Sequence, residues 1–263
     1  MSSPNGNRAG RLLAPLTPLL ALSDLASEGM ANGGSFRFAD HLYKAEPSGR
    51  FLVGYCLDSV FMRMPAAAAF RRRYLHARDA MALVIRARAS AGTVRVLTVP
   101  CGIPRDIVEA ADILGHESPA LLDCVEYVGM DIDPRALRVA EEFAADSCLR
   151  AMTFHQGNAL LPGDYPSGLF HMVSSTGLTE FLDDREIETM FANIHDALEP
   201  GGTFYTSASA IDPLSARLLG AINLRARYRS QSELAAILGR LQWQRVAYVV
   251  DSTGLQTFVT AVK

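Results

Sequence analysis

The sequence predicts a doubly wound α/β fold, with a mostly parallel, seven-stranded sheet, a C-terminal antiparallel hairpin and a helical N-terminal extension. Three observations predict it. From residue 94 onward, short β-branched runs alternate with helix-like runs, which is the pattern of a parallel sheet. Residues 243–263 contain two strand-like runs on either side of a turn signal. Residues 1–90 are helical in pattern and show no strand alternation.

The N-terminal extension begins with residues 1–10, which are rich in Gly, Ser and Asn and are expected to be disordered. The next segment, Arg11–Ala26, is apolar, but two prolines interrupt it and it is too short to span a bilayer. We therefore expect a terminal helix packed on the domain rather than a signal peptide or anchor. After a break at Gly33–Gly34, Phe61–Ala89 is helical in pattern, and its run Arg71–Arg73 is interpreted as a solvated helix face.

Strands and helices alternate from residue 94. The strands are expected at Val94–Val99, Val125–Asp131, Met152–His155, Phe170–Ser174 and Thr203–Ser207, and the helices at Arg105–Leu114, Pro134–Ala145, Asp184–Leu198 and Gln231–Leu241. Asp183 or Asp184 is expected to cap the third of these helices, and Pro200-Gly201-Gly202 to end it. A turn at Asp251–Gly254 separates the two strands of the hairpin.

The composition is that of an ordinary globular protein. The chain has 263 residues, of which 49% are hydrophobic and 20% charged, and its formal net charge is −3. This charge predicts no nucleic-acid partner. The four cysteines form no C-x-x-C pair and lie at no zinc-ligand spacing to a histidine. We therefore expect free thiols in a reducing cytosol, no metal site and no membrane partner, and a homodimer is left open.

The first motif follows the first predicted strand, where Val94–Val99 leads into Pro100-Cys101-Gly102 and the start of a helix. In an open α/β sheet, ligands bind beyond the carboxyl ends of the strands. Gly102 has no Cβ that would keep a ligand away from the backbone. The turn is therefore interpreted as a cofactor cradle, and a tight turn that binds nothing is the alternative.

Polar side chains follow the next two strands. Asp131 offers two oxygens to the two hydroxyls of a ribose, and it has no capping role. Asp133, with Pro134 at the first helical position, is expected to cap a helix, which explains it better than the D-x-D motif of metal-binding glycosyltransferases. Asn158 is suited to a purine edge or, by itself, to a turn.

These motifs in this order resemble the class I S-adenosylmethionine-dependent methyltransferases that act on small molecules, over roughly residues 94–263. Val99-Pro100-Cys101-Gly102 matches a variant of the family's first motif, and the "LEPGGTF" stretch matches the one before the fifth strand. The resemblance implies S-adenosylmethionine as cofactor and methyl transfer to a small-molecule acceptor. The cofactor contacts that it implies are Pro100, Cys101 and Gly102 at the methionine part, Asp131 at the ribose, Ile132, Asn158 and Ala159 at the adenine, and Ser175, Thr176 and Gly177 under the sulfonium.

The chain departs from the family pattern at two positions. Thr98 stands where the family usually has an acid at the end of the first strand, so the contact to the cofactor's ammonium group is left open. Pro104 stands where the last glycine of the turn is usual. Proline is tolerated there if it lies in the first turn of the helix, because its missing N–H has no intrahelical acceptor.

Residues 1–90 are expected to form a substrate lid, and residues 91–263 the cofactor-binding domain. Tyr74 and Arg78 lie one turn apart on the last helix before the sheet and are candidates for the cofactor's carboxylate. Glu180 and His41 are the candidates for a general base, although a structural role explains His41 better. Two alternatives remain, a relative that binds the cofactor without methyl transfer and a nicotinamide dehydrogenase. Against the dehydrogenase, the sequence lacks the G-x-G-x-x-G motif, and its spacing from Gly102 to Asp131 exceeds the ~20 residues that are usual between that motif and its acidic residue.

Overall fold

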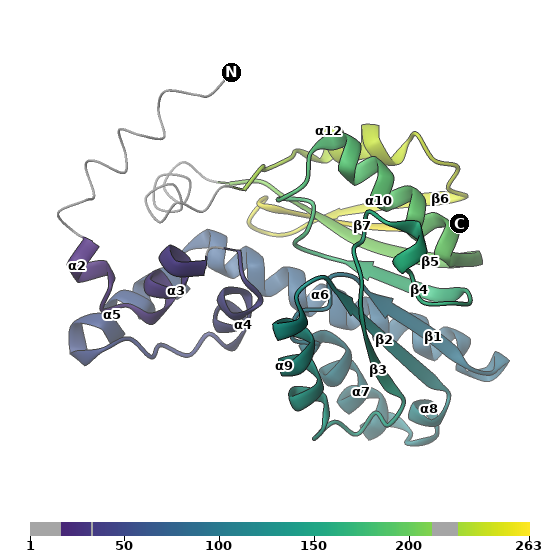
Figure 1. Cartoon of the computed structure of the whole chain (residues 1–263), viewed down its shortest axis with the longest axis horizontal. Coiled ribbons are helices and arrows are strands. Elements are labelled where there is room, and N and C mark those ends of the chain that lie inside the picture. Colours follow the sequence, from purple (N-terminus) through teal and green to yellow (C-terminus); the bar gives the residue numbers. More distant parts are fainter. Residues whose placement is uncertain (1–16, 33, 212–225) are drawn as a thin grey trace.

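The computed structural model of the chain describes residues 17–32, 34–211 and 226–263, and it confirms the predicted α/β fold (Figure 1). Seven strands form one sheet in the order β3-β2-β1-β4-β5-β7-β6. The strands are β1 (Val94–Thr98), β2 (Val125–Asp131), β3 (Met152–Gln156), β4 (Phe170–Ser175), β5 (Leu198–Ser209), β6 (Arg245–Val250) and β7 (Gln256–Val262). The first five are parallel, whereas β7 runs antiparallel to β5 and β6.

Helices precede the sheet and connect its strands. They are α2 (Thr17–Leu20), α3 (Asp24–Asn32), α4 (Phe36–Lys44), α5 (Phe51–Met62), α6 (Pro65–Arg88), α7 (Arg105–Glu117), α8 (Ala120–Asp123), α9 (Pro134–Ala144), α10 (Asp184–Ala197) and α12 (Gln231–Leu238), with short 3₁₀ turns at Ala89–Ala91 and Pro162–Asp164. The expected disorder of residues 1–10 lies outside the described residues. So does the first part of the segment Arg11–Ala26, whose remainder forms α2 and the start of α3.

The parallel strands β1, β2 and β4 are apolar at most positions, and since successive side chains point to opposite faces, both faces of the sheet are apolar. On one face, Leu97 and Val173 pack with residues of α10 and α12, such as Phe191 and Leu234. On the other face, the sheet packs against α6 and α7 in a second cluster. The carboxyl ends of the five parallel strands therefore lie at one edge, where the two helix layers leave the loops free.

Several predicted boundaries differ from the structure, since α7 continues to Glu117 and α12 ends at Leu238, and the largest difference is at the start of β5. The helix expected to end at Leu198 ends at Ala197, and β5 already begins at Leu198 rather than at Thr203. Leu198 pairs with Phe170 of β4, and the register shifts before Met172. Gly201 has a φ of +77° and donates its N–H to Lys263 O at 2.7 Å, so the Pro-Gly-Gly stretch is held inside the sheet. Pairing with the neighbouring strands outweighed the local stop signal.

Both helix caps at the sheet edge are those that the sequence predicts. Asp133 accepts the Arg135 N–H at 2.9 Å and Pro134 is the first residue of α9, as predicted. Of the two candidates for the start of α10, Asp183 is the cap, in a capping box with Glu186.

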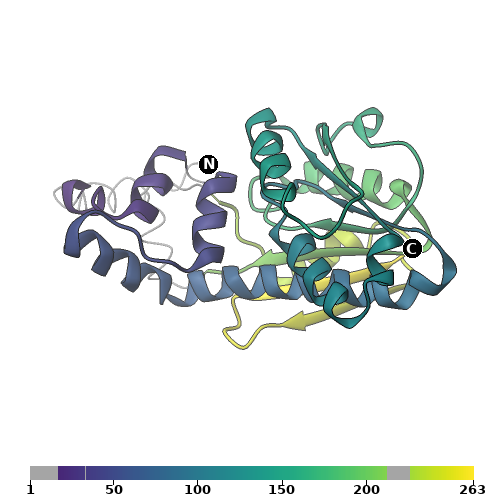
Figure 2. The ribbon, with the colours of Figure 1, turned by 90° about the horizontal axis from the view of Figure 1, so that it is seen from below.

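The N-terminal helices share a small apolar core of their own, which consists of Leu25, Phe38, Leu42, Met62 and Ala67. Figure 2 shows α6 as the long helix that runs from this group of helices along the sheet. Its second half packs against the sheet through Met81 and Ile85, both 0% exposed. Helix α6 is therefore shared by the two predicted parts of the chain, and the division at residue 90 stays a prediction.

Candidate functional site

A cavity of about 620 Å³ lies at the carboxyl ends of the parallel strands, between the sheet and the N-terminal helices. This volume suits a small-molecule ligand. Its wall on the sheet side includes Thr98, Pro100, Cys101, Gly102, Asp106, Asp131, Ile132, Asp133, Thr176, Gly177 and Glu180, and its wall on the helical side includes Glu28, Phe36, Arg37, Asp40, Tyr43, Phe70, Arg73 and Tyr74. Residues before and after position 90 thus line one site.

The turn after β1 is held in place by backbone contacts. Cys101 donates its N–H to Met130 O at 2.9 Å, and its buried side chain packs over Gly129, where a Cβ would lie 3.1 Å from that of Cys101. Gly102 has a φ of +48°, and a Cβ there would meet only Phe36, at 3.5 Å. Its left-handed conformation therefore requires glycine more than its packing does. Pro104 is the N-cap of α7, where its missing N–H leaves no helical hydrogen bond unmade.

Asp131 joins this turn to the end of β2. Its Oδ2 accepts the Gly102 N–H and its Oδ1 accepts the Asp133 N–H, each at 3.0 Å. Asp131 caps no helix, as expected, but its side chain has a structural contact as well, because it connects two loops. Burial raises the pKa of the Asp131 carboxyl, and the hydrogen bonds from Asp133 and Gly102 offset part of that rise. Each oxygen still has a lone pair for a further donor.

The loop after β4 places two of its three predicted residues in the cavity. Thr176 and Gly177 line it, whereas Ser175 is fully buried below it, with Oγ 3.9 Å from Met190 Sδ. Gly177 has a φ of +82°, and a Cβ there would lie 3.0 Å from the Arg73 guanidinium. Glycine is thus required both by the backbone conformation and by this close side chain.

Asn158 and Ala159 do not line the cavity. Asn158 Oδ1 accepts the Leu160 N–H at 3.0 Å, which is a turn contact. Ala159 O accepts the hydroxyl of Tyr165 at 3.0 Å and the amide of Asn193 at 3.1 Å. Ile132, by contrast, lines the cavity with 63% of its surface exposed.

Arg73 is a site residue that the sequence analysis missed, and the interpretation of Arg71–Arg73 as a solvated helix face is wrong for it. Only 3% of its surface is exposed. Its guanidinium donates to Glu180 Oε1 at 3.3 Å and to the Tyr43 hydroxyl at 3.1 Å, and it lies 4.2 Å from the centre of the Phe70 ring. The signal was in the spacing, because residues 69, 73, 77, 81 and 85 are all buried and follow one another at intervals of four.

Tyr74 and Arg78, the two predicted candidates on α6, are placed differently. Tyr74 lines the cavity and stacks on Tyr43 with ring centres 4.9 Å apart, and its buried hydroxyl makes no hydrogen bond to the part of the chain that the structure describes. Arg78 does not line the cavity. It pairs with Asp79 at 2.8 Å and with Glu109 at 3.5 Å.

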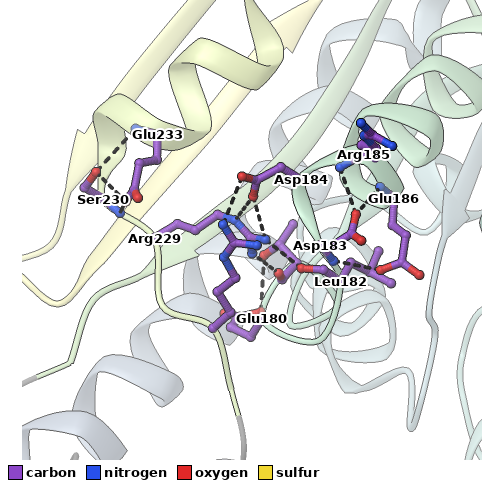
Figure 3. A network of polar contacts seen from close by, with 11 residues as sticks. Glu180, Leu182, Asp183, Asp184, Arg185, Glu186, Arg229, Ser230 and Glu233 are labelled. Atoms are coloured by element: carbon purple, nitrogen blue, oxygen red, sulfur yellow. Dashed lines mark hydrogen bonds and ion pairs between the residues drawn. The ribbon is translucent and has the colours of Figure 1, made fainter. Parts of the chain in front are cut away.

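Glu180 lines the cavity and is 5% exposed. Its Oε1 accepts hydrogen bonds from Arg73 and, at 2.5 Å, from Ser209, and its Oε2 accepts one from Thr179 at 3.2 Å. Three donors thus orient this carboxylate. Figure 3 shows that Glu180 lies next to a second network around Arg229, which reaches the start of α10.

His41, the other candidate base, lies away from the cavity, among the N-terminal helices. Its Nε2 is 3.3 Å from Ser48 Oγ and 3.8 Å from Asp58 Oδ2. Asp58 is fully buried and also accepts the N–H of Ser48 at 3.2 Å. These contacts are those of a structural histidine.

Comparisons with known proteins bear on this geometry. The family model described as "Methyltransferase domain" matches residues 96–202. No curated protein matches the chain significantly. Among solved structures, a protein from Bordetella parapertussis described as a "possible exported protein" is 22% identical with a TM-score of 0.67, over 87% of this chain and 79% of that one. At this identity the likeness shows a shared fold.

Two further structures share the fold. The S-adenosylmethionine-dependent methyltransferase SibL in its apo form is 16% identical with a TM-score of 0.57, over 96% of this chain and 76% of that one. Magnesium protoporphyrin IX methyltransferase from Synechocystis PCC 6803 with bound SAH is 14% identical with a TM-score of 0.56, over 91% of this chain and 100% of that one. Within the described ranges, no helix is both long and apolar enough to cross a bilayer.

Proposed function

We propose that this protein transfers a methyl group from S-adenosylmethionine to a small-molecule acceptor bound in the same cavity, because its residues 96–202 match the family model of a methyltransferase domain. The sheet order supports this proposal over a nicotinamide dehydrogenase. The dinucleotide-binding fold has the all-parallel order 3-2-1-4-5-6, whereas here an antiparallel β7 lies between β5 and β6.

One observation carries the proposal, the hydrogen bond between Gly102 N and Asp131 Oδ2. It brings a carboxylate and an open backbone turn to the same wall of the cavity. Asp131 is suited to hold the two ribose hydroxyls, because both of its oxygens keep accepting capacity. Pro100, Cys101 and Gly102 would then lie along the methionine part of the cofactor.

The remaining cofactor contacts follow from the cavity walls. Ile132 offers an exposed apolar side chain for the adenine, and we assign the cofactor's carboxylate to Arg73, which lies beside Gly177. Arg73 replaces Arg78 in this role because Arg73 lines the cavity and Arg78 does not. The adenine contacts of Asn158 and Ala159 stay a prediction.

The chain's contribution to the reaction is mainly alignment. S-adenosylmethionine supplies a methyl group on a sulfonium, which leaves as a neutral thioether. Alignment of reacting groups accounts for much of the rate in such a displacement. Aromatic side chains from both sides, Phe36, Tyr43, Phe70, Phe181 and Tyr228, enclose the space for the acceptor. Glu180 would orient the acceptor, because three hydrogen bonds already hold its carboxylate in one position.

Calorimetry with S-adenosylhomocysteine tests the cofactor, and transfer from tritiated S-adenosylmethionine to a panel of small phenols, amines and carboxylic acids tests the reaction. We expect micromolar binding and transfer to at least one acceptor class. If the protein binds neither S-adenosylmethionine nor its product at millimolar concentration, the proposal fails. Binding without transfer to any acceptor would favour the alternative of a cofactor-binding protein that does not transfer methyl groups.

The lid role of the N-terminal helices gives a further prediction. Helix α4 supplies Phe36, Arg37, Asp40 and Tyr43 to the cavity, and Asp40 pairs with Arg105 of α7 at 2.5 Å. Deletion of residues 1–30 removes Leu25 from the apolar core that supports α4. We expect this deletion to impair methyl transfer more than cofactor binding, measured by transfer assay and calorimetry on the same preparation.

The substitution Lys44→Ala is the matched control for the lid. Lys44 pairs with the other oxygen of Asp40 at 2.9 Å and is half-exposed, so its loss should change neither quantity much. Equal losses of transfer and cofactor binding in the deletion variant would contradict the lid role.

The expected cytosolic location and the oligomeric state also stay predictions. Cell fractionation and light scattering would measure them.

A further inference from the structure

Asp106 is a carboxylate in the cavity with no cationic partner among the residues that the structure describes. It lies in the first turn of α7, lines the cavity and accepts only the N–H of Ile107, at 2.9 Å. The nearby arginines are engaged elsewhere, since Arg78 pairs with Asp79 and Glu109, and Arg105 pairs with Asp40. Asp106 is half-buried, and a carboxylate that is partly removed from water without a counter-ion is costly, so its place in a ligand cavity needs a physical reason.

The burial of Asp106 outweighs the favourable position at a helix start. An acid in the first turn of a helix is usually stabilised by the helix dipole. Here burial is the largest influence and raises the pKa of the Asp106 carboxyl to about 6. An acid with a purely structural role at a helix start is expected to have a lowered pKa, whereas the pKa of Asp106 is raised.

Two hydroxyl groups that line the cavity with Asp106 make no hydrogen bond within the described residues. Thr98 and Tyr74 line the cavity with Asp106, are 4% and 7% exposed, and have no partner for their hydroxyls. Unsatisfied buried hydroxyls are each costly, so the two that face the cavity point to a polar ligand.

We propose that Asp106, with Thr98 and Tyr74, binds a primary ammonium group in this cavity. An ammonium has three donors and a positive charge, which match one carboxylate and two hydroxyl acceptors. On the proposed function, on which this inference rests, the ammonium is the amino group of the cofactor's methionine part. The other source of the same chemistry is an amine acceptor. Thr98 has no charge of its own, and Asp106 supplies the charge from α7 instead of from the end of β1.

The substitution Asp106→Asn tests the contact with two ligands. We expect the Kd for S-adenosylhomocysteine to rise about 10- to 100-fold, because a charged hydrogen bond is lost. The Kd for 5′-methylthioadenosine, which lacks the amino acid part, should not change. Asp112→Asn is the matched control, since Asp112 lies further along α7, is exposed, and accepts the Cys148 thiol outside the cavity. It should leave both affinities unchanged.

The stability of the ligand-free protein gives a second measurement. The folded pKa of about 6 lies above the ordinary value of 3.8 for an aspartate, so the ionised carboxylate destabilises the fold fully above pH 6, and the effect fades below pH 4. Asp106→Asn should therefore raise the melting temperature at pH 8, with a smaller gain towards pH 4. The titratable groups that act on Asp106 or are acted on by it are Tyr74 of α6, Cys101 of the turn, Glu109 of α7, Tyr127 of β2 and Tyr205 of β5.

A second substitution checks the location of the charge. Thr98→Asp in the Asp106→Asn background returns a carboxylate to the same end of the cavity, and part of the lost affinity for S-adenosylhomocysteine should return. In the wild-type background, Thr98→Asp should give no gain, because Asp106 already supplies the charge.

The outcomes separate this inference from the proposed function. Unchanged affinity for S-adenosylhomocysteine, equal losses for both ligands, or a lower melting temperature at pH 8 in Asp106→Asn would each overturn the ammonium site. If the wild-type protein binds neither nucleoside, the proposed function fails. In that case methylammonium serves as the probe. Stabilisation of the wild type but not of Asp106→Asn would support the ammonium site, and no stabilisation of either would overturn it.

Discussion

Asp131→Ala is expected to lower the affinity for S-adenosylhomocysteine by about 2–4 kcal/mol, because it removes two charge-assisted hydrogen bonds to the ribose. The same substitution frees the N–H groups of Gly102 and Asp133, which Asp131 accepts at 3.0 Å, so the turn after β1 loses a contact. Calorimetry measures the affinity, and circular dichroism shows whether the variant is folded.

Asp133→Asn is the control for Asp131. Asp133 also lines the cavity, and its side chain caps α9 through the Arg135 N–H at 2.9 Å. Asparagine caps a helix about as well as aspartate, so this variant removes a nearby negative charge and keeps the fold. We expect little change in its cofactor affinity. Unchanged affinity in a folded Asp131→Ala variant would remove Asp131 from the site.

Arg229→Ala is expected to lower the free energy of unfolding by about 2–4 kcal/mol, because it leaves buried carbonyl groups without donors. Arg229 is 4% exposed. It donates to the carbonyl oxygens of Thr179 and Leu182, the latter at 2.6 Å, and to Asp184 at 2.9 Å (Figure 3). These contacts hold the loop that carries Glu180. Urea unfolding measures the effect.

Arg227→Ala is the matched control for Arg229. Arg227 pairs with the same Asp184, at 3.0 Å, but its side chain is 54% exposed. An exposed ion pair contributes roughly 0–1 kcal/mol, so we expect a small loss. If both substitutions destabilise the protein equally, the buried carbonyl contacts of Arg229 do not account for its effect.

The parallel strands and the closing hairpin could be predicted because their patterns are local. The apolar periods of β1, β2 and β4 lie within a few residues, and the predicted ends differ from the observed ends by one residue or none. The start of β5 could not be predicted in the same way. Leu198 belongs to a strand because it pairs with Phe170, and such pairing between distant segments outweighs a local Pro-Gly-Gly signal.

The part of the site that could be predicted lies directly after strands. Residues that follow parallel strands gather at one edge of the sheet, and this placed the turn at Gly102, Asp131 and Gly177 in one cavity. Residue type and spacing predict Arg78 and His41, and neither lines the cavity. Arg73 could have been predicted from its place in a row of residues spaced by four whose other members, Ala69, Ala77, Met81 and Ile85, are apolar.

The sequence by itself determined the order of strands and helices, the caps of α9 and α10, and the carboxylate at the end of β2. These depend on neighbours within one or two helical turns, and their physical causes are periodicity, capping and backbone freedom. Only the tertiary structure decided that Arg73 meets Glu180, 107 residues away, and that Asp106 lines one cavity with Thr98 and Tyr74 and has no cationic partner among the described residues. Burial and pairing of charges depend on which distant elements pack together, and no local pattern contains that information.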